Sequence, residues 1–84
     1  MKVIWKFPVT DSSVDIAIPQ GARILCLQMQ AGQPCIWAEV DIEAPAITRT
    51  AHIVMTGQGY ASCPGEYCGT VQDGAYVLHI FLEA

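Results

Sequence analysis

The sequence predicts an all-β domain, built as a compact antiparallel sandwich or rolled sheet of about seven short strands. Apolar and polar residues alternate with a period of two along most of the chain, whereas no stretch of eleven residues keeps a helical stripe. Glycine, proline and Asp-Gly turn signals separate the alternating stretches at short intervals. Because 84 residues supply one core and no linker is visible, residues 1–84 are expected to form a single β domain.

The first two expected strands lie in the N-terminal quarter of the chain. Residues 2–7 place Val3, Trp5 and Phe7 on one side and two lysines on the other, and the following proline ends the stretch. Residues 14–18 alternate in the same way and precede a Pro-Gln-Gly turn. Both stretches therefore predict strands with one buried face.

A hairpin is expected in the middle of the chain. Residues 22–30 are apolar on one face through Leu25, Leu27 and Met29. An Ala-Gly-Gln-Pro turn signal connects them to residues 35–41, which form the expected return strand.

The C-terminal half predicts one long strand, an irregular loop and a second hairpin. Residues 48–56 are rich in β-forming side chains, and residues 57–66 hold the glycines and the proline of a loop. Residues 67–72 and 76–82 are expected to pair across an Asp-Gly turn. One face of the long strand carries Thr48, Thr50, His52, Val54 and Thr56.

The composition predicts self-association. Hydrophobic residues make up 52% of the chain and charged residues 14%, against a usual charged share of about 25%. A folded monomer of 9.1 kDa exposes about 4,900 Å² by the usual scaling, so few charges must cover a large surface. We therefore expect a homo-oligomer that covers an apolar face.

The charge excludes some partners. A net charge of −4 and only four basic residues argue against binding to duplex nucleic acid. The N-terminal residues lack the apolar run of a signal peptide, and no run approaches the length of a membrane span. The expected location is the cytoplasm, and no membrane partner is expected.

Residues that could carry catalysis or bind a metal do not form a recognised constellation. Cys63 and Cys68 have a four-residue spacer, but no second pair accompanies them, so no metal site is expected. His52 and His79 have no nucleophile or carboxylate at a catalytic spacing. The chain is therefore expected to bind rather than to catalyse, without a cofactor.

An aromatic and cationic set remains as the candidate ligand site. Aromatic rings stack on nucleobases, and an arginine can pair with a phosphate, so such a set can hold a small nucleotide. Arg49 is the main candidate, although a solvated strand arginine is an equal alternative, and a tryptophan such as Trp37 is more often a core residue in a domain of this size. The candidate ligand-binding residues are Arg49, Trp37, Tyr60, Thr48, Thr50, Gln58 and Lys6.

Several segments, taken in order, resemble a family of small phage and prophage proteins. The resemblance covers nearly the whole chain and breaks at residues 61–64, where the loop differs. The segments that carry it are Ile4-Trp5-Lys6-Phe7, Pro19-Gln20-Gly21-Ala22-Arg23-Ile24-Leu25, Gln28-Met29-Gln30, Cys35-Ile36-Trp37-Ala38-Glu39-Val40-Asp41, Thr48-Arg49, Thr56-Gly57, Tyr67-Cys68-Gly69-Thr70-Val71-Gln72 and Phe81-Leu82-Glu83.

Through that family the chain is similar to phage anti-CBASS sponge proteins, which oligomerise and sequester cyclic dinucleotide signals such as 3′,3′-cGAMP. The resemblance implies a phage-encoded immune-evasion protein that blocks CBASS signalling of the host without cleaving the signal. In this hypothesis Trp37 or Tyr60 stacks on a base and Arg49 pairs with a phosphate. The alternative is a small protein–protein interaction module of a phage or prophage, and a hydrolase of the signal is the third hypothesis.

Overall fold

The structure is a computed structural model that describes residues 1–62 and 64–84, and it confirms an all-β fold. All strand pairs are antiparallel, and each predicted strand is present with ends shifted by no more than two residues. The strands are β1 (Lys2–Pro8), β2 (Ser13–Pro19), β3 (Arg23–Gln30), β4 (Gln33–Asp41), β5 (Ala46–Met55), β6 (Glu66–Asp73) and β7 (Tyr76–Leu82). The described residues contain no helix that could cross a membrane.

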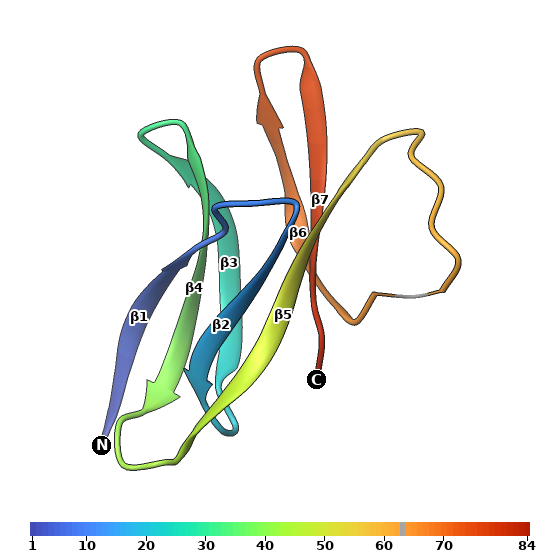
Figure 1. The fold of residues 1–84 in the computed structure, drawn as a ribbon. Coiled ribbons are helices and arrows are strands. Elements are labelled where there is room, and N and C mark those ends of the chain that lie inside the picture. Colours follow the sequence, from blue (N-terminus) through green and yellow to red (C-terminus); the bar gives the residue numbers. More distant parts are fainter. Residues whose placement is uncertain (63) are drawn as a thin grey trace.

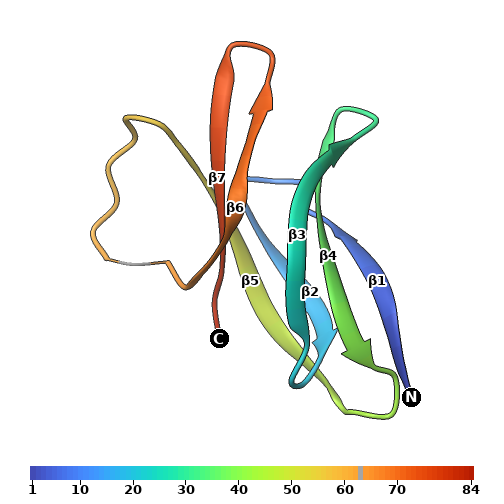
Figure 2. The same ribbon diagram turned by 180° about the vertical axis from the view of Figure 1, so that it is seen from behind.

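The strands form two sheets, shown from opposite sides in Figures 1 and 2. One sheet has the order β1-β4-β3 and the other has the order β2-β5-β7-β6. The sheets approach each other where β3 lies beside β6, as Figure 2 shows. The molecule is thin, with principal extents of 39 × 30 × 17 Å. Each sheet therefore has one inner face toward the core and one broad outer face.

Both predicted hairpins are present. At the β3–β4 turn, Ala31 and Gly32 have φ angles of 51° and 77°, the two positive φ angles of a type I′ hairpin turn. At the β6–β7 turn, Asp73 pairs with Tyr76, so the turn residues are Gly74 and Ala75, one residue later than the predicted Asp-Gly turn. These turns set the register of the residues next to them.

The prediction that Leu25 shares the apolar face of Leu27 and Met29 is wrong. The register shifts between Ile24 and Cys26, so the strand has a bulge at Leu25. Leu25 is 39% exposed, whereas Ile24 packs against the core in its place. One extra residue reverses the alternation for the part of the strand that precedes it.

The core lies between the two inner faces. Its fully buried side chains include Ile18 from β2, Ile36 from β4 and Ile80 from β7. Val3 and Phe7 of β1 pack against this core, as predicted. Trp5 shares their side of the strand and packs edge-on against Phe7, with ring centroids 6.3 Å apart, yet it remains 42% exposed. The other buried hydrophobic residues are Val9, Ile16, Leu27, Cys35, Ala38, Val40, Ala51, Val54, Val71, Leu78 and Leu82.

Candidate functional site

The structure distributes the predicted ligand residues over three places. In β5 the side chains of neighbouring residues point to opposite faces, so Thr48 and Thr50 lie on the outer face and Arg49 lies on the inner face. Thr50 confirms this direction, because its hydroxyl donates a hydrogen bond of 2.8 Å to Asp15 Oδ1 on the outer side of β2. The threonines and the arginine therefore do not form one pocket within the chain.

Arg49 is bound to the C-terminal end of the same chain. Its Nε donates to the carbonyl of Glu83 at 2.6 Å, and its Nη2 donates to the carbonyl of Leu82 at 3.4 Å. Nη2 also lies 3.2 Å from Glu66 Oε1, and the Arg49 side chain is only 12% exposed. This arginine joins β5, β7 and β6 in the described fold.

Lys6 and Trp37 are cross-strand partners on the outer face of the three-stranded sheet. We call this surface the Trp37 face, and it comprises Lys2, Ile4, Lys6, Arg23, Trp37, Glu39 and Asp41. Lys6 Nζ donates a 2.6 Å hydrogen bond to Gln30 Oε1.

Glu39 provides the opposite charge on the Trp37 face. Its carboxylate lies 3.8 Å from Lys2 Nζ and 3.5 Å from Arg23 Nη2. Both basic side chains are about two-thirds exposed, so these ion pairs add little to stability. The face therefore combines an indole ring with three cations that solvent can reach.

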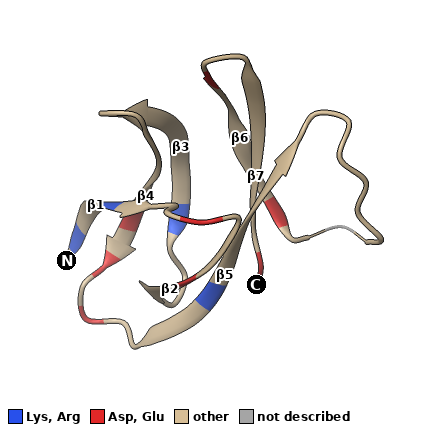
Figure 3. Cartoon of the chain, turned by 45° about the horizontal axis from the view of Figure 1, so that its top comes forward, with Lys and Arg blue, Asp and Glu red and all other residues tan. Residues whose placement is uncertain are grey.

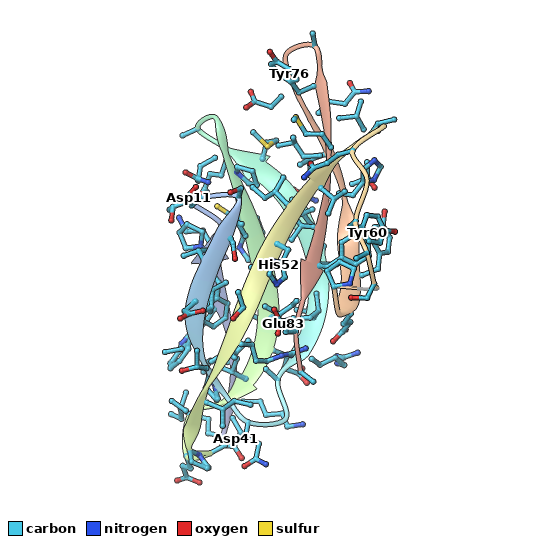
Figure 4. The ribbon with its side chains drawn as sticks, turned by 45° about the vertical axis from the view of Figure 1, so that its right-hand side comes forward. Asp11, Asp41, His52, Tyr60, Tyr76 and Glu83 are labelled. Atoms are coloured by element: carbon cyan, nitrogen blue, oxygen red, sulfur yellow. The ribbon has the colours of Figure 1, made fainter. Side chains whose placement is uncertain are left out.

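Tyr60 belongs to a cluster on the outer face of the four-stranded sheet, and Gln58 lies beside it. We call it the tyrosine face, and it comprises Thr56, Tyr60, Tyr67, Thr70, His79 and Phe81. The Phe81 ring lies 6.2 Å from Tyr60 and 5.5 Å from Tyr67, centroid to centroid. The loop after β5 thus brings Tyr60 over the sheet, and Figure 4 shows it beside the strands.

A chain of hydrogen bonds crosses the tyrosine face. The Thr56 hydroxyl lies 2.7 Å from His79 Nε2, and the Thr70 hydroxyl lies 2.9 Å from His79 Nδ1. Thr70 is also hydrogen-bonded to the Tyr67 hydroxyl. A neutral imidazole donates through one nitrogen and accepts through the other, so all donors in this series of hydrogen bonds point the same way along it. A ligand with its own donors and acceptors can extend the series.

A recess of about 310 Å³ opens beside this chain and is lined by Gln58 and Tyr60 together with His79 and Phe81. Gln58 closes the turn after β5, because its Oε1 accepts a 3.0 Å hydrogen bond from the Met55 N–H.

Sequence reasoning missed Thr70 and His79 as partners, although a signal was present. A two-residue turn after Asp73 places Thr70 opposite His79 if the ladder is regular, and the structure has this pair. Tyr67 was not predictable in the same way, because a bulge between Tyr67 and Gly69 shifts the register.

The other titratable residues serve mainly local contacts. His52 Nε2 is paired with Glu83 Oε2, and Figure 4 shows both on the surface of β5 and the C-terminal segment. Asp41 accepts a 3.0 Å hydrogen bond from the Glu43 N–H, which lowers the pKa of its carboxyl. Burial raises the pKa of the Cys68 thiol to about 11.

The cysteines give no sign of a metal centre in the part of the chain that is described. Cys26, Cys35 and Cys68 are free thiols, and Cys63 lies outside the described residues. Within residues 1–62 and 64–84, no group of three His, Cys, Asp or Glu side chains is arranged to hold a metal ion.

Comparison with known proteins identifies a family without an assigned activity. A family model described as Domain of unknown function (DUF7352) matches residues 1–84. No curated protein and no solved structure matches the chain.

Proposed function

Since the chain belongs to the DUF7352 family, whose function is unknown, we propose a function from its own surfaces: it binds a small nucleotide and sequesters it without cleaving it. In the fuller form of this proposal, it is a phage-encoded protein that captures a cyclic nucleotide such as 3′,3′-cGAMP in the host cytoplasm and thereby blocks CBASS signalling. This fuller form rests in addition on the resemblance to phage and prophage proteins described above.

The tyrosine face supports this proposal best. Tyr60, Tyr67 and Phe81 gather three aromatic rings on one face, and stacking on such rings contributes about 1–3 kcal/mol for each base. Hydroxyl and imidazole groups lie next to the rings and can bond the edge of a base. The recess of about 310 Å³ is at the lower end of the range of small-ligand sites, so it suits one base rather than a whole dinucleotide.

The decisive experiment is a melting-temperature screen with 3′,3′-cGAMP, other cyclic di- and trinucleotides, and ADP-ribose derivatives. A ligand at 100 times its Kd adds about 2.7 kcal/mol, which raises the Tm of a domain of this size by roughly 10–20 °C. Tyr60→Ala is expected to abolish the shift. Tyr76→Ala is the matched control, because Tyr76 is similarly exposed, at 63% against 58% for Tyr60, and lies at the far β6–β7 turn.

Heat release distinguishes sequestration from turnover. A complex that is heated after prolonged incubation should return the intact ligand by liquid chromatography. Recovery of a cleaved product would overturn the proposal in favour of a hydrolase. The absence of a thermal shift with every nucleotide would favour a protein–protein interaction module instead, for which the exposed side chain of Ile4 on the Trp37 face is the supporting observation.

A further inference from the structure

We propose that a second copy of this chain completes the ligand site, by docking its Trp37 face head to tail on the tyrosine face of the first copy. The ligand part of this inference rests on the proposed function, whereas the docking part rests on charge and exposure alone. The candidate ligand residues Lys6 and Trp37 lie on one outer face, and Gln58 and Tyr60 lie on the outer side of the other sheet. One chain cannot bring these two groups together, because the core separates them.

Charge is distributed unequally between the two sheets. Three of the four basic residues, Lys2, Lys6 and Arg23, lie on the Trp37 face, and Figure 3 shows the basic positions of β1 and β3. Two carboxylates, Glu39 and Asp41, lie on the same face, so its side chains carry a net charge of +1, three cations less two anions. The remaining basic residue, Arg49, points to the inner face and is held by Glu66 and the C-terminal carbonyls.

The four-stranded sheet carries the opposite charge. The outer face carries two carboxylates, Asp15 and Glu83, which contact Thr50 and His52 there, and the described strands add no lysine or arginine to that face. Two surfaces of opposite sign on one molecule attract each other between copies, and like faces repel. Glu66 and Asp73 are not part of this face, because Glu66 pairs with Arg49 opposite buried Leu82 and Asp73 lines a recess with Leu78.

Both outer faces expose large apolar or aromatic side chains. Ile4 is 62% exposed on the Trp37 face. Tyr60 and Tyr67 are 58% and 56% exposed on the tyrosine face. Outer faces of two sheets can pack about 10 Å apart, and a standard interface takes roughly 800 Å² from each partner. That area is about one-sixth of the 5057 Å² surface of the chain, which the outer face of a thin molecule can supply.

The docked arrangement supplies a cation for the phosphate of the proposed nucleotide ligand. The tyrosine face contains rings and hydrogen-bonding groups but no lysine or arginine. Lys6 of the docked copy would supply the cation for a phosphate, and Trp37 of that copy would supply a ring for the second base. Because two different faces meet, the assembly is head to tail and grows into a closed ring or an open chain rather than a twofold dimer.

A mixing experiment tests the docking. Lys6→Glu damages only the Trp37 face and Tyr60→Ala damages only the tyrosine face, and both side chains are exposed, so both variants should keep the circular dichroism spectrum of the native protein. In analytical ultracentrifugation at about 1–100 µM, which covers weak and moderate affinities, the native chain should form species larger than a dimer. Each variant alone should sediment as a monomer.

Mixing the two variants should then give a heterodimer, because each supplies the intact face that the other lacks. Glu43→Ala is the control, since Glu43 follows β4 outside both faces and should leave the native assembly unchanged. A native chain that stays monomeric would overturn the docking. Variants that fail to form a heterodimer when mixed would also overturn it, and would indicate a twofold interface if the native chain is a dimer.

The ligand readout separates the two proposals. The heterodimer should bind 3′,3′-cGAMP at a stoichiometry of one ligand per two chains, whereas each variant alone should bind at least tenfold more weakly. A heterodimer that forms but binds no nucleotide would refute the proposed function and retain the docking. A native monomer that binds nucleotide one to one would refute the docking and retain the function.

Discussion

Replacing Arg49 by alanine should destabilise the protein even when no ligand is present. From the sequence alone, Arg49 is a surface strand residue whose removal should leave the melting temperature nearly unchanged. In the structure its guanidinium donates to two main-chain carbonyls and pairs with Glu66, and its side chain is 12% exposed. The substitution therefore removes a connection between β5 and the C-terminal end of β7.

The magnitude follows from the contacts. A hydrogen bond to a charged group contributes about 1.5–3 kcal/mol, whereas the half-exposed Glu66 pair contributes at most about 1 kcal/mol. Because the two carbonyl bonds share one side chain and are not additive, we expect a loss of about 3 kcal/mol. A domain of this size has a total stability of about 4–12 kcal/mol, and the loss should lower Tm by roughly 12–24 °C.

Urea and thermal unfolding followed by circular dichroism measure this effect. Arg23→Ala is the matched control, because Arg23 is also a strand arginine beside a carboxylate but is 69% exposed with a single 3.5 Å contact to Glu39. The control should change stability by less than about 0.5 kcal/mol. If Arg49→Ala and Arg23→Ala unfold at the same urea concentration, the structural role assigned to Arg49 is refuted.

Three further predictions concern packing and protonation. Gly69→Ala should lower the free energy of unfolding in urea by about 1–3 kcal/mol, because Gly69 has a φ of 146° and a Cβ there would lie 3.0 Å from Leu27 Cβ. Gly59→Ala is the control and should cost far less, because a Cβ at Gly59 would have no atom within 4 Å. Equal losses in the two variants would contradict the clash. Burial raises the pKa of the Cys68 thiol in the folded protein from 9.0 to about 11, so the unfolded state loses this proton first. The free energy of unfolding should therefore fall as the pH rises from about 9 to 11, and it should fall less in Cys68→Ala. The same pH profile in the variant and the native protein would refute the assignment. Ile80→Val should cost about 0.5–1.5 kcal/mol because Ile80 is fully buried, and a neutral result in thermal unfolding would contradict its place in the core.

The candidate site was predicted only in part. Tyr60 and Gln58 were named from the sequence as ligand residues, and the structure brings them to one recess. Their neighbours His79 and Phe81 come from a strand about twenty residues later, and only the pairing of β5 with β7 places them there. Long-range pairing is decided by how apolar faces pack together, which no local pattern records.

The sequence by itself determined the all-β class, the seven strands and both hairpins. These features depend on alternation and turn chemistry, which act over a few neighbouring residues: the pairing of β6 with β7 and the face shared by Val3 and Phe7 are examples. The tertiary structure alone decided the direction of Leu25 and the partners of Arg49. A bulge displaces Leu25, and the C-terminal carbonyls that bind Arg49 lie more than thirty residues away in the chain, so both outcomes depend on the packing of distant strands.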